Sequence, residues 1–212
     1  MRKKTFALLI LTCALGSIPG YAVRRDFSPA EISCARSVGA AIDNGRNYAD
    51  PSVGPRTLAW ISDLVIRGSA TSIRSDLEGA YHTLVDVQVT ETLKGTSLPQ
   101  ITVTLRSGLA WAASEGQIMR LTVSHEPTFT VGEDLFLFLT LDYASMPGTT
   151  AGTYALDANQ YNLVAKGKYL VVDAAAGRVV NAAFPVERHT IQQMRDDVQT
   201  TVSAQSTNCG NP

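Results

Sequence analysis

The residues best suited to catalysis are few and widely separated in this sequence. Histidine, the usual general base near neutral pH, occurs at His82, His125 and His189. His125 adjoins Glu126, and a histidine beside a carboxylate can act as a base with an orienting partner. Because neighbouring side chains on an extended chain point opposite ways, a solvated loop pair is the simpler interpretation. A hydrolase would need His82, His125 and Glu126 to converge on a polar cleft.

Familiar catalytic and cofactor-binding motifs are missing from the sequence. There is no HExxH, no GxSxG elbow, no GxxxxGK[ST] phosphate loop and no GxGxxG fingerprint. The carboxylates Asp76 and Glu78 are no closer than chance would place them, so they do not indicate a calcium or glycosidase site. We therefore predict a protein that is not an enzyme and that uses neither a cofactor nor a metal.

Aromatic residues near two expected loops are the candidates for a binding surface. Trp111 lies in "GLAWAASEG", where an exposed tryptophan would anchor a partner protein. The alternative is that Trp111 folds back over one end of the sheet. Tyr143 and Tyr154 flank the loop "MPGTTAG" and would join the same rim, unless they are ordinary sheet aromatics. The sequence therefore predicts ligand or partner binding at Trp111, Tyr143 and Tyr154.

The first residues have the layout of a secretory signal peptide. Arg2, Lys3 and Lys4 precede the apolar run "FALLILTCALGSIPG", and small residues then lead to the polar "RRD". We place cleavage after Ala22, so that residues 1–22 form the signal and the mature protein is periplasmic or secreted. A retained membrane anchor is the alternative, but the run is shorter than the roughly 20 apolar residues that a span needs.

Without the signal, the chain is mildly acidic and keeps two cysteines. The full sequence has 18 Lys and Arg against 19 Asp and Glu, and the signal would remove three basic residues. An acidic chain without a basic tract argues against nucleic acid as a partner. In an oxidising compartment, we expect the remaining cysteines, Cys34 and Cys209, to form one disulfide; two unpaired thiols are the alternative.

Short β-strands at regular spacing dominate the middle of the sequence. In "VDVQVTETL", Val85, Val87 and Val89 alternate with polar residues and predict a strand with one buried face. Gly68 and Gly167 interrupt two other strands and predict bends. Residues 106–116 are expected to be loop. The expected strands are 64–75, 81–93, 101–105, 117–123, 134–143, 153–157, 161–173 and 177–181.

Helices flank this β region at both ends. Ser28 and Pro29 supply an N-cap and a first-turn proline, which predict a helix over residues 29–39. A helical turn is expected over residues 56–63, and a second helix over residues 187–204. Apolar residues recur three or four apart along that last segment and form one face of the helix. They are Ile191, Met194, Val198 and Val202.

The run "DLFLFLTLD" is apolar on both faces of its strand, so both faces need a cover. Short strands with bends at glycine favour a small closed barrel whose interior takes the leucines. The C-terminal helix would then cover Phe136 and Phe138, with the N-terminal helix nearby. A two-layer sandwich, with the phenylalanines facing a second sheet, is the alternative. The leucines of this run are Leu135, Leu137, Leu139 and Leu141.

Four stretches resemble a pattern found in secreted bacterial proteins of uncharacterised function. They are "SDLVIRGSATSI", "VDVQVTETLKG", "ITVTL" and "FTVGEDLFLFL", within residues 62–142. In that group, a strand of the form ADxVVxGxVxxV leads to VxVxExLKG and then to FxxGExxLLFL. The layout is similar to the netrin-like domain of tissue inhibitors of metalloproteinases. This resemblance implies a mainly β fold, an OB-like closed barrel with N-terminal and C-terminal helices packed on it.

The resemblance does not extend to zinc-protease inhibition. Those inhibitors grip the catalytic zinc through an amino-terminal cysteine, whereas the expected mature chain starts at Val23 and its first cysteine is Cys34. We therefore expect residues 23–212 to form one domain, an exported non-enzymatic binding or accessory module that acts through contacts with an extracytoplasmic protein. Its ligand and oligomeric state are left open. The alternatives are a cell-envelope structural protein without a ligand site and the hydrolase considered above.

Overall fold

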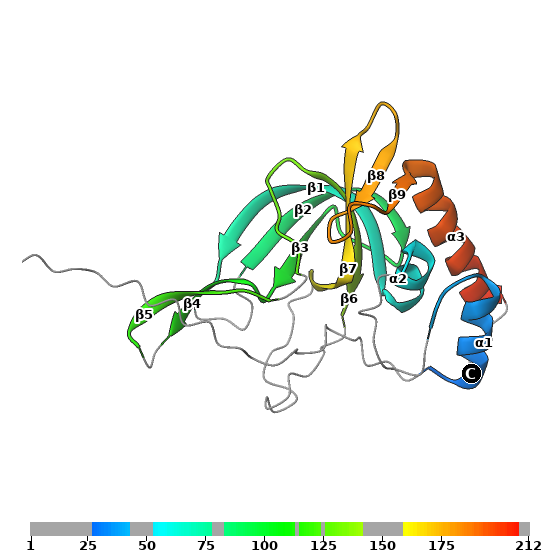
Figure 1. Ribbon diagram of the computed structural model, residues 1–212, viewed down its shortest axis with the longest axis horizontal. Helices are drawn as coiled ribbons and strands as arrows, with labels where there is room; N and C mark the ends of the chain where they lie inside the picture. The colour runs from blue at the N-terminus through cyan, green and yellow to red at the C-terminus, as the bar shows by residue number, and fades with distance from the viewer. Residues whose placement is uncertain are drawn as a thin grey trace, which may run out of the picture.

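A closed five-stranded β-barrel with helices at both ends of the chain forms the centre of the protein (Figure 1). The computed structural model describes residues 27–42, 53–77, 83–112, 115–123, 126–141 and 159–207. The expected signal peptide and the expected strand over residues 153–157 lie outside these ranges. Within them, no helix combines the length and the apolar character needed to cross a membrane.

Three helices and nine strands are found in the described ranges. The helices are α1 (Pro29–Ser37), α2 (Pro55–Ile61) and α3 (Ile191–Thr207). The strands are β1 (Leu64–Ser75), β2 (Thr83–Lys94), β3 (Gln100–Leu105), β4 (Gly108–Ala112), β5 (Gln117–Leu121), β6 (Asp134–Thr140), β7 (Gln160–Asp173), β8 (Arg178–Asn181) and β9 (Arg188–Thr190).

The barrel closes through one parallel pairing among antiparallel ones. β2 pairs with β1 and β3, β1 pairs with β6, and β6 pairs with β7. The parallel pairing of β3 with β7, from Thr102 opposite Gln160 to Thr104 opposite Asn162, joins the two ends of the sheet. β8 and β9 extend the same sheet beyond β7. The predicted OB-like closed barrel is confirmed, and the two-layer sandwich is excluded.

The barrel interior is filled by the alternating apolar residues that the sequence predicted. Val85 and Val87 of β2 face inward, and Val89 packs at the edge of the same cluster. Leu141 is the exception, because it is 55% exposed and lies one residue beyond the end of β6. Its N–H donates to the Asp63 carboxylate at 2.8 Å, just after β6 has ended. The remaining interior residues include Ile101, Val103, Leu135, Leu137 and Leu139.

The opposite face of β6 packs against the helices, as predicted. Phe136 and Phe138 are completely buried, in one cluster with Met194 and Val198 of α3. Trp60 of α2 is also buried and belongs to the same cluster. Burial of each phenylalanine contributes roughly 1.5–3 kcal/mol. The helices α1, α2 and α3 therefore form a helical layer, which covers the face of β6 that points away from the barrel interior.

Both predicted glycine bends are confirmed by register shifts. β1 shifts against β2 between Arg67 and Gly68, where a Cβ would collide with the carbonyl oxygen of Gln88. β7 shifts against β6 next to Gly167, where a Cβ would lie 2.8 Å from the carbonyl oxygen of Phe138. Only glycine allows the strands to approach so closely at these two points.

The predicted start of the last helix and the predicted loop over residues 106–116 are wrong, for reasons of pairing and capping. The last helix begins at Ile191 rather than at residue 187, because Arg188–Thr190 pairs with β8 as β9. The Thr190 hydroxyl accepts from the Gln193 N–H at 3.0 Å, and the Gln193 side chain accepts from the Thr190 N–H at 2.7 Å. This capping box fixes the start of α3. The expected loop over residues 106–116 contains β4.

Candidate interaction surface

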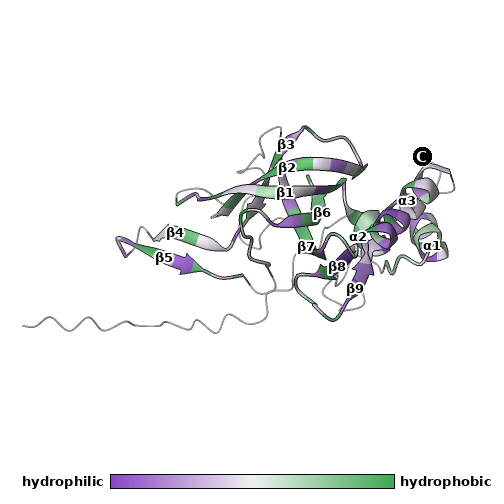
Figure 2. Cartoon of the chain, turned by 90° about the horizontal axis from the view of Figure 1, so that it is seen from above, coloured by the Kyte–Doolittle hydropathy of each residue, from purple (hydrophilic) through white to green (hydrophobic). Residues whose placement is uncertain are grey.

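The β4–β5 hairpin is a two-stranded sheet separate from the barrel sheet. Its register runs from Gly108 opposite Leu121 to Ala112 opposite Gln117. In both views the hairpin extends from the barrel on the side away from α1 and α3 (Figures 1 and 2). The helical layer and this hairpin therefore lie at opposite ends of the molecule.

Large apolar side chains are exposed on both faces of the hairpin. Successive side chains of a strand point to opposite faces, so Leu109, Trp111 and Ile118 share one face and Met119 and Leu121 the other. All five residues of β5 are exposed. In Figure 2, β5 carries both apolar and polar segments, whereas β4 is coloured green to white. The exposed fractions are 41% for Leu109, 49% for Trp111, 52% for Ile118, 39% for Met119 and 41% for Leu121.

The base of the hairpin is clamped by hydrogen bonds around Ser107. The Glu126 carboxylate accepts from the N–H of Arg106 at 3.0 Å and from the N–H of Ser107 at 2.6 Å. The Thr83 hydroxyl donates to the Ser107 carbonyl at 2.7 Å, and the Val123 N–H donates to the Ser107 hydroxyl at 3.0 Å. These bonds connect the start of β4 to the start of β2 and to the segment after β5. The hairpin is thus held firmly at its stem.

Backbone hydrogen bonds hold the turn of the hairpin and the edge of β4 that faces away from β5. The Ala112 carbonyl accepts from the N–H groups of Glu115 and Gly116, and Gly116 adopts the left-handed conformation with φ 61°. On the other side of β4, the Trp111 N–H donates to the Leu77 carbonyl at 2.9 Å. β4 is therefore supported on both sides, whereas β5 has β4 on one side only within the described residues.

Trp111 is the one predicted binding residue that the structure describes. It lies on β4 instead of in a loop, and its half-exposed indole is not buried under the end of the barrel. Tyr143 and Tyr154 lie outside the described residues. Cys34 is half-buried on α1, against the helical cluster, but Cys209 lies outside the described ranges. The predicted disulfide therefore stays a prediction.

The residues considered for catalysis do not form a described site. His82, His125 and Glu78 lie outside the described residues, and the Glu126 carboxylate is occupied by the two backbone N–H groups of the hairpin stem. His189 lies on β9, its ring 5.7 Å from that of Tyr169. Across the described ranges, no three His, Cys, Asp or Glu residues gather as metal ligands.

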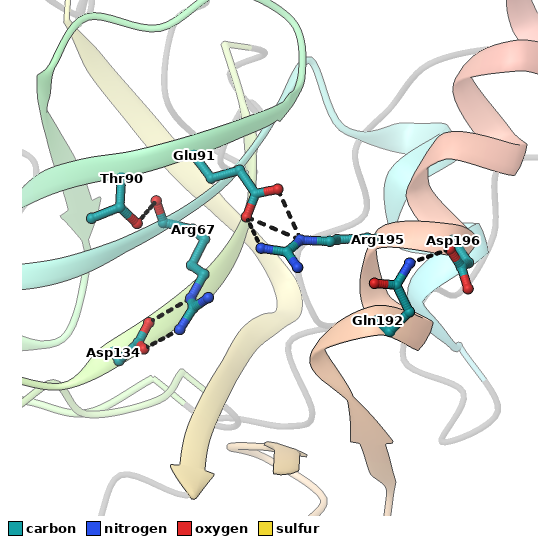
Figure 3. A network of polar contacts seen from close by, with 7 residues as sticks. All are labelled: Arg67, Thr90, Glu91, Asp134, Gln192, Arg195 and Asp196. Carbon is teal, nitrogen blue, oxygen red and sulfur yellow. Dashed lines mark hydrogen bonds and ion pairs between the residues drawn. The ribbon is translucent and has the colours of Figure 1, made fainter. Parts of the chain in front are cut away.

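One ion pair joins α3 to β2, and another joins the neighbouring barrel strands β1 and β6 (Figure 3). Arg195 of α3 donates to both oxygens of Glu91 on β2, at 2.8 and 2.9 Å. Arg67 of β1 donates to both oxygens of Asp134 on β6, at 3.0 and 2.6 Å. The hydrogen bonds to Asp134 raise the pKa of Arg67, and those to Glu91 raise the pKa of Arg195. The Arg195–Glu91 pair holds α3 against β2, and the Arg67–Asp134 pair joins β1 to β6.

A second polar cluster surrounds Asp86 on the outer face of β2. Its carboxylate accepts from the Ser72 hydroxyl at 2.6 Å, the Thr102 hydroxyl at 2.8 Å and the Arg74 guanidinium at 3.0 Å. Burial opposes ionisation of Asp86, but these hydrogen bonds outweigh it and lower the pKa of the carboxyl. Thr102 of β3 therefore points out of the barrel interior toward Asp86, although it is buried by this cluster.

Lys168 of β7 is a buried cation with several partners. Its ammonium donates to Glu133 at 2.6 Å and to the Thr128 carbonyl, and it lies 4.2 Å from the centre of the Phe129 ring. Burial lowers the pKa of Lys168, and the hydrogen bond to Glu133 opposes that shift. The lysine therefore anchors the segment before β6, and its amine is fully engaged.

Four of the five exposed apolar residues on the hairpin were not predicted as binding residues. Ile118, Met119 and Leu121 were assigned to a strand, and Leu109 to a loop. The signal was present in "QIMRL", where apolar residues fall on both faces of one short strand. Such a strand in the sequence indicates either burial on both sides or an exposed surface, and periodicity alone does not distinguish them.

No protein-family model matches this chain, and no curated protein matches it either.

Proposed function

We propose that this protein is an exported, non-enzymatic binding or accessory module whose contact surface is the β4–β5 hairpin. The observation that carries the proposal is the exposure of Trp111 and Ile118 on a ribbon whose other face is also apolar. Tryptophan and large aliphatic residues are the side chains that contribute most when a partner covers them. Contiguous apolar surface on a soluble protein typically marks such a contact.

The rest of the described molecule supports this choice of surface. The apolar face of α3 is covered, and the ion pairs beside it are satisfied. The polar cluster at Asp86 is satisfied internally as well. The hairpin is the region where apolar residues gather without a cover from the described part of the chain. The proposed export and the proposed Cys34–Cys209 disulfide rest on the sequence, and the netrin-like relationship rests on the resemblance described there.

The test compares the mature, oxidised protein with hairpin variants as bait for proteins of native envelope and culture fractions. Trp111→Ser and Ile118→Thr remove apolar surface without touching the stem contacts of Ser107 and Glu126. We expect retention of a specific partner, re-measured with purified components, to fall at least tenfold. Val186→Ser is the matched control, because Val186 is 87% exposed and lies before β9. Equal retention by the hairpin variants and the control would refute the proposal.

A further inference from the structure

The free edge of β5 presents a defined set of backbone groups. The Trp111 N–H points away from β5, because it donates to Leu77. In an antiparallel pair, facing residues direct their N–H and C=O groups either both toward or both away from each other. Ile118 faces Trp111, so its backbone groups also point outward, and the alternation gives Arg120 the same orientation. Among the described residues, no strand pairs with this edge.

An edge of this kind is a template for another strand. Unpaired N–H and C=O groups on an exposed apolar strand favour addition of a further strand. A two-stranded hairpin is also only marginally stable in water, and additional strands stabilise it. β5 carries one charged residue, Arg120, between the apolar residues Met119 and Leu121. Recognition at this edge therefore depends on what lies opposite Arg120.

The sequence of β5 is complementary to itself in one antiparallel register. In an antiparallel pair of two β5 strands, the residues whose backbone groups point outward must lie opposite each other. Ile118 and Arg120 of one copy can therefore pair only with Ile118 or Arg120 of the other. Arg120 opposite Arg120 would place like charges together, which is destabilising. Ile118 opposite Arg120 avoids that contact and uses both outward residues of each copy. Met119 then lies on the two-fold axis, opposite Met119 of the second copy.

We propose that the partner of the hairpin is a second copy of this chain, joined through β5 in that register. The proposal rests on the proposed function, because it names the occupant of the same surface. The product is a four-stranded antiparallel sheet in the order β4, β5, β5 and β4. On one face, each Arg120 lays its aliphatic stem beside Ile118 of the other copy, and on the other face the Met119 side chains meet.

A charge exchange at the axis tests the register. Met119→Lys and Met119→Glu each place two like charges opposite each other, so we expect each variant to weaken self-association at least tenfold in sedimentation equilibrium. An equimolar mixture should restore the dimer, because unlike charges then face each other. Gln117→Lys is the matched control. It lies on the same face of β5, but this register puts it opposite Leu121, so self-association should change less than about threefold.

Cross-linking gives an independent measurement on the full mature chain. Met119→Cys places two thiols opposite each other within the roughly 4.4–6.8 Å between Cα atoms that a disulfide requires. We expect a covalent dimer under mild oxidation. Gln117→Cys is the control, because its two copies lie roughly 14 Å apart along the strands and should remain uncross-linked. Cross-linking of both variants to the same extent would overturn the register.

The remaining outcomes separate this proposal from the proposed function. A mature protein that stays monomeric across about a hundredfold range of concentration overturns the dimer. If Trp111→Ser still abolishes capture of another protein in that case, the hairpin remains a binding surface and only its partner was wrong. Binding of the monomer to vesicles of anionic lipid, or to an acidic extended peptide, likewise overturns the second copy as occupant. If hairpin variants change neither association nor capture, both proposals fail.

Discussion

Apolar side chains are buried on the helical side of the barrel and exposed on the β4–β5 hairpin. On the helical side, Phe138 of β6 is fully buried beneath α3, whose own Met194 is also fully buried. On the hairpin, Trp111 and Ile118 are about half exposed, although both lie on regular strands. A helix with one apolar stripe and a sheet face can cover each other completely. A two-stranded ribbon has two faces, and the described chain provides no layer for them.

This difference indicates which region holds the fold together and which is available for contacts. Stability should depend on the helical layer, because its burial is complete and its charges are paired. The hairpin should contribute little to global stability beyond its stem, which leaves its surface available to a partner. Mutations in the two regions can therefore test the distinction directly.

The largest effect is expected in the helical layer. Phe138→Ala would leave a cavity between β6 and α3, next to the Tyr169 ring, whose centre lies 5.7 Å from that of Phe138. We expect the free energy of unfolding to fall by about 3–5 kcal/mol, measured by urea denaturation. The matched aromatic truncation in the hairpin, Trp111→Ala, should cost only about 0.5 kcal/mol. Similar losses for the two variants would contradict the assignment of stability to the helical side.

An intermediate effect is expected at the stem of the hairpin. Glu126→Ala removes the acceptor of the Arg106 and Ser107 N–H groups. The lost bonds should cost about 1–3 kcal/mol locally, because backbone donors are left unpaired. Hydrogen exchange should accelerate over β4 and β5 while exchange in the barrel strands is unchanged. Glu126→Gln keeps one acceptor oxygen and should have a smaller effect. Unchanged exchange in both variants would show that Glu126 does not hold the hairpin.

The smallest effect is expected at Asp86 and depends on pH. Its pKa is lowered in the folded protein, so the ionised form stabilises the fold above the ordinary pKa of about 3.9. That contribution is lost as the pH falls through the lowered pKa. Asp86→Asn should therefore cost about 1–2 kcal/mol near neutral pH and progressively less in acid.

Denaturation at neutral pH and at a series of acidic pH values measures the difference between wild type and Asp86→Asn. Thr71→Ala is a suitable control, because the Thr71 hydroxyl bonds the backbone carbonyl of Asp86 and not its carboxylate. Its cost should not vary with pH. A cost of Asp86→Asn that grows in acid would mean that Asp86 has a raised pKa instead.

The strands of the barrel were predictable because their local pattern and their tertiary environment agree. Val85 and Val87 alternate with polar residues, and the barrel buries that face. The two glycine bends also had a local signal, since only glycine permits close strand approach there. The start of α3 was missed, although Thr190 and Gln193 carry a capping-box pattern that would have located it. The capping residues thus indicate the start of α3, which the apolar spacing does not.

The interaction surface was only partly predictable. Trp111 was selected for its residue type, but its place on a strand depends on pairing with Ile118, a partner that no local pattern specifies. Leu109, Met119 and Leu121 are residue types typical of a protein core. They are exposed because the hairpin extends away from the barrel, where no described element covers it. The roles of Glu126 and Lys168 were equally hidden, since their partners are backbone groups or residues distant in the sequence.

The sequence by itself determined the alternation that makes each barrel strand, the glycine bends and the apolar stripe of the last helix, because these depend on neighbours a few residues away. Only the tertiary structure decided that β3 closes against β7, that Arg195 of α3 pairs with Glu91 of β2, and that the hairpin keeps its apolar faces in solvent. Burial is a property of the whole assembly of elements, and a side chain's type does not state whether another element will cover it.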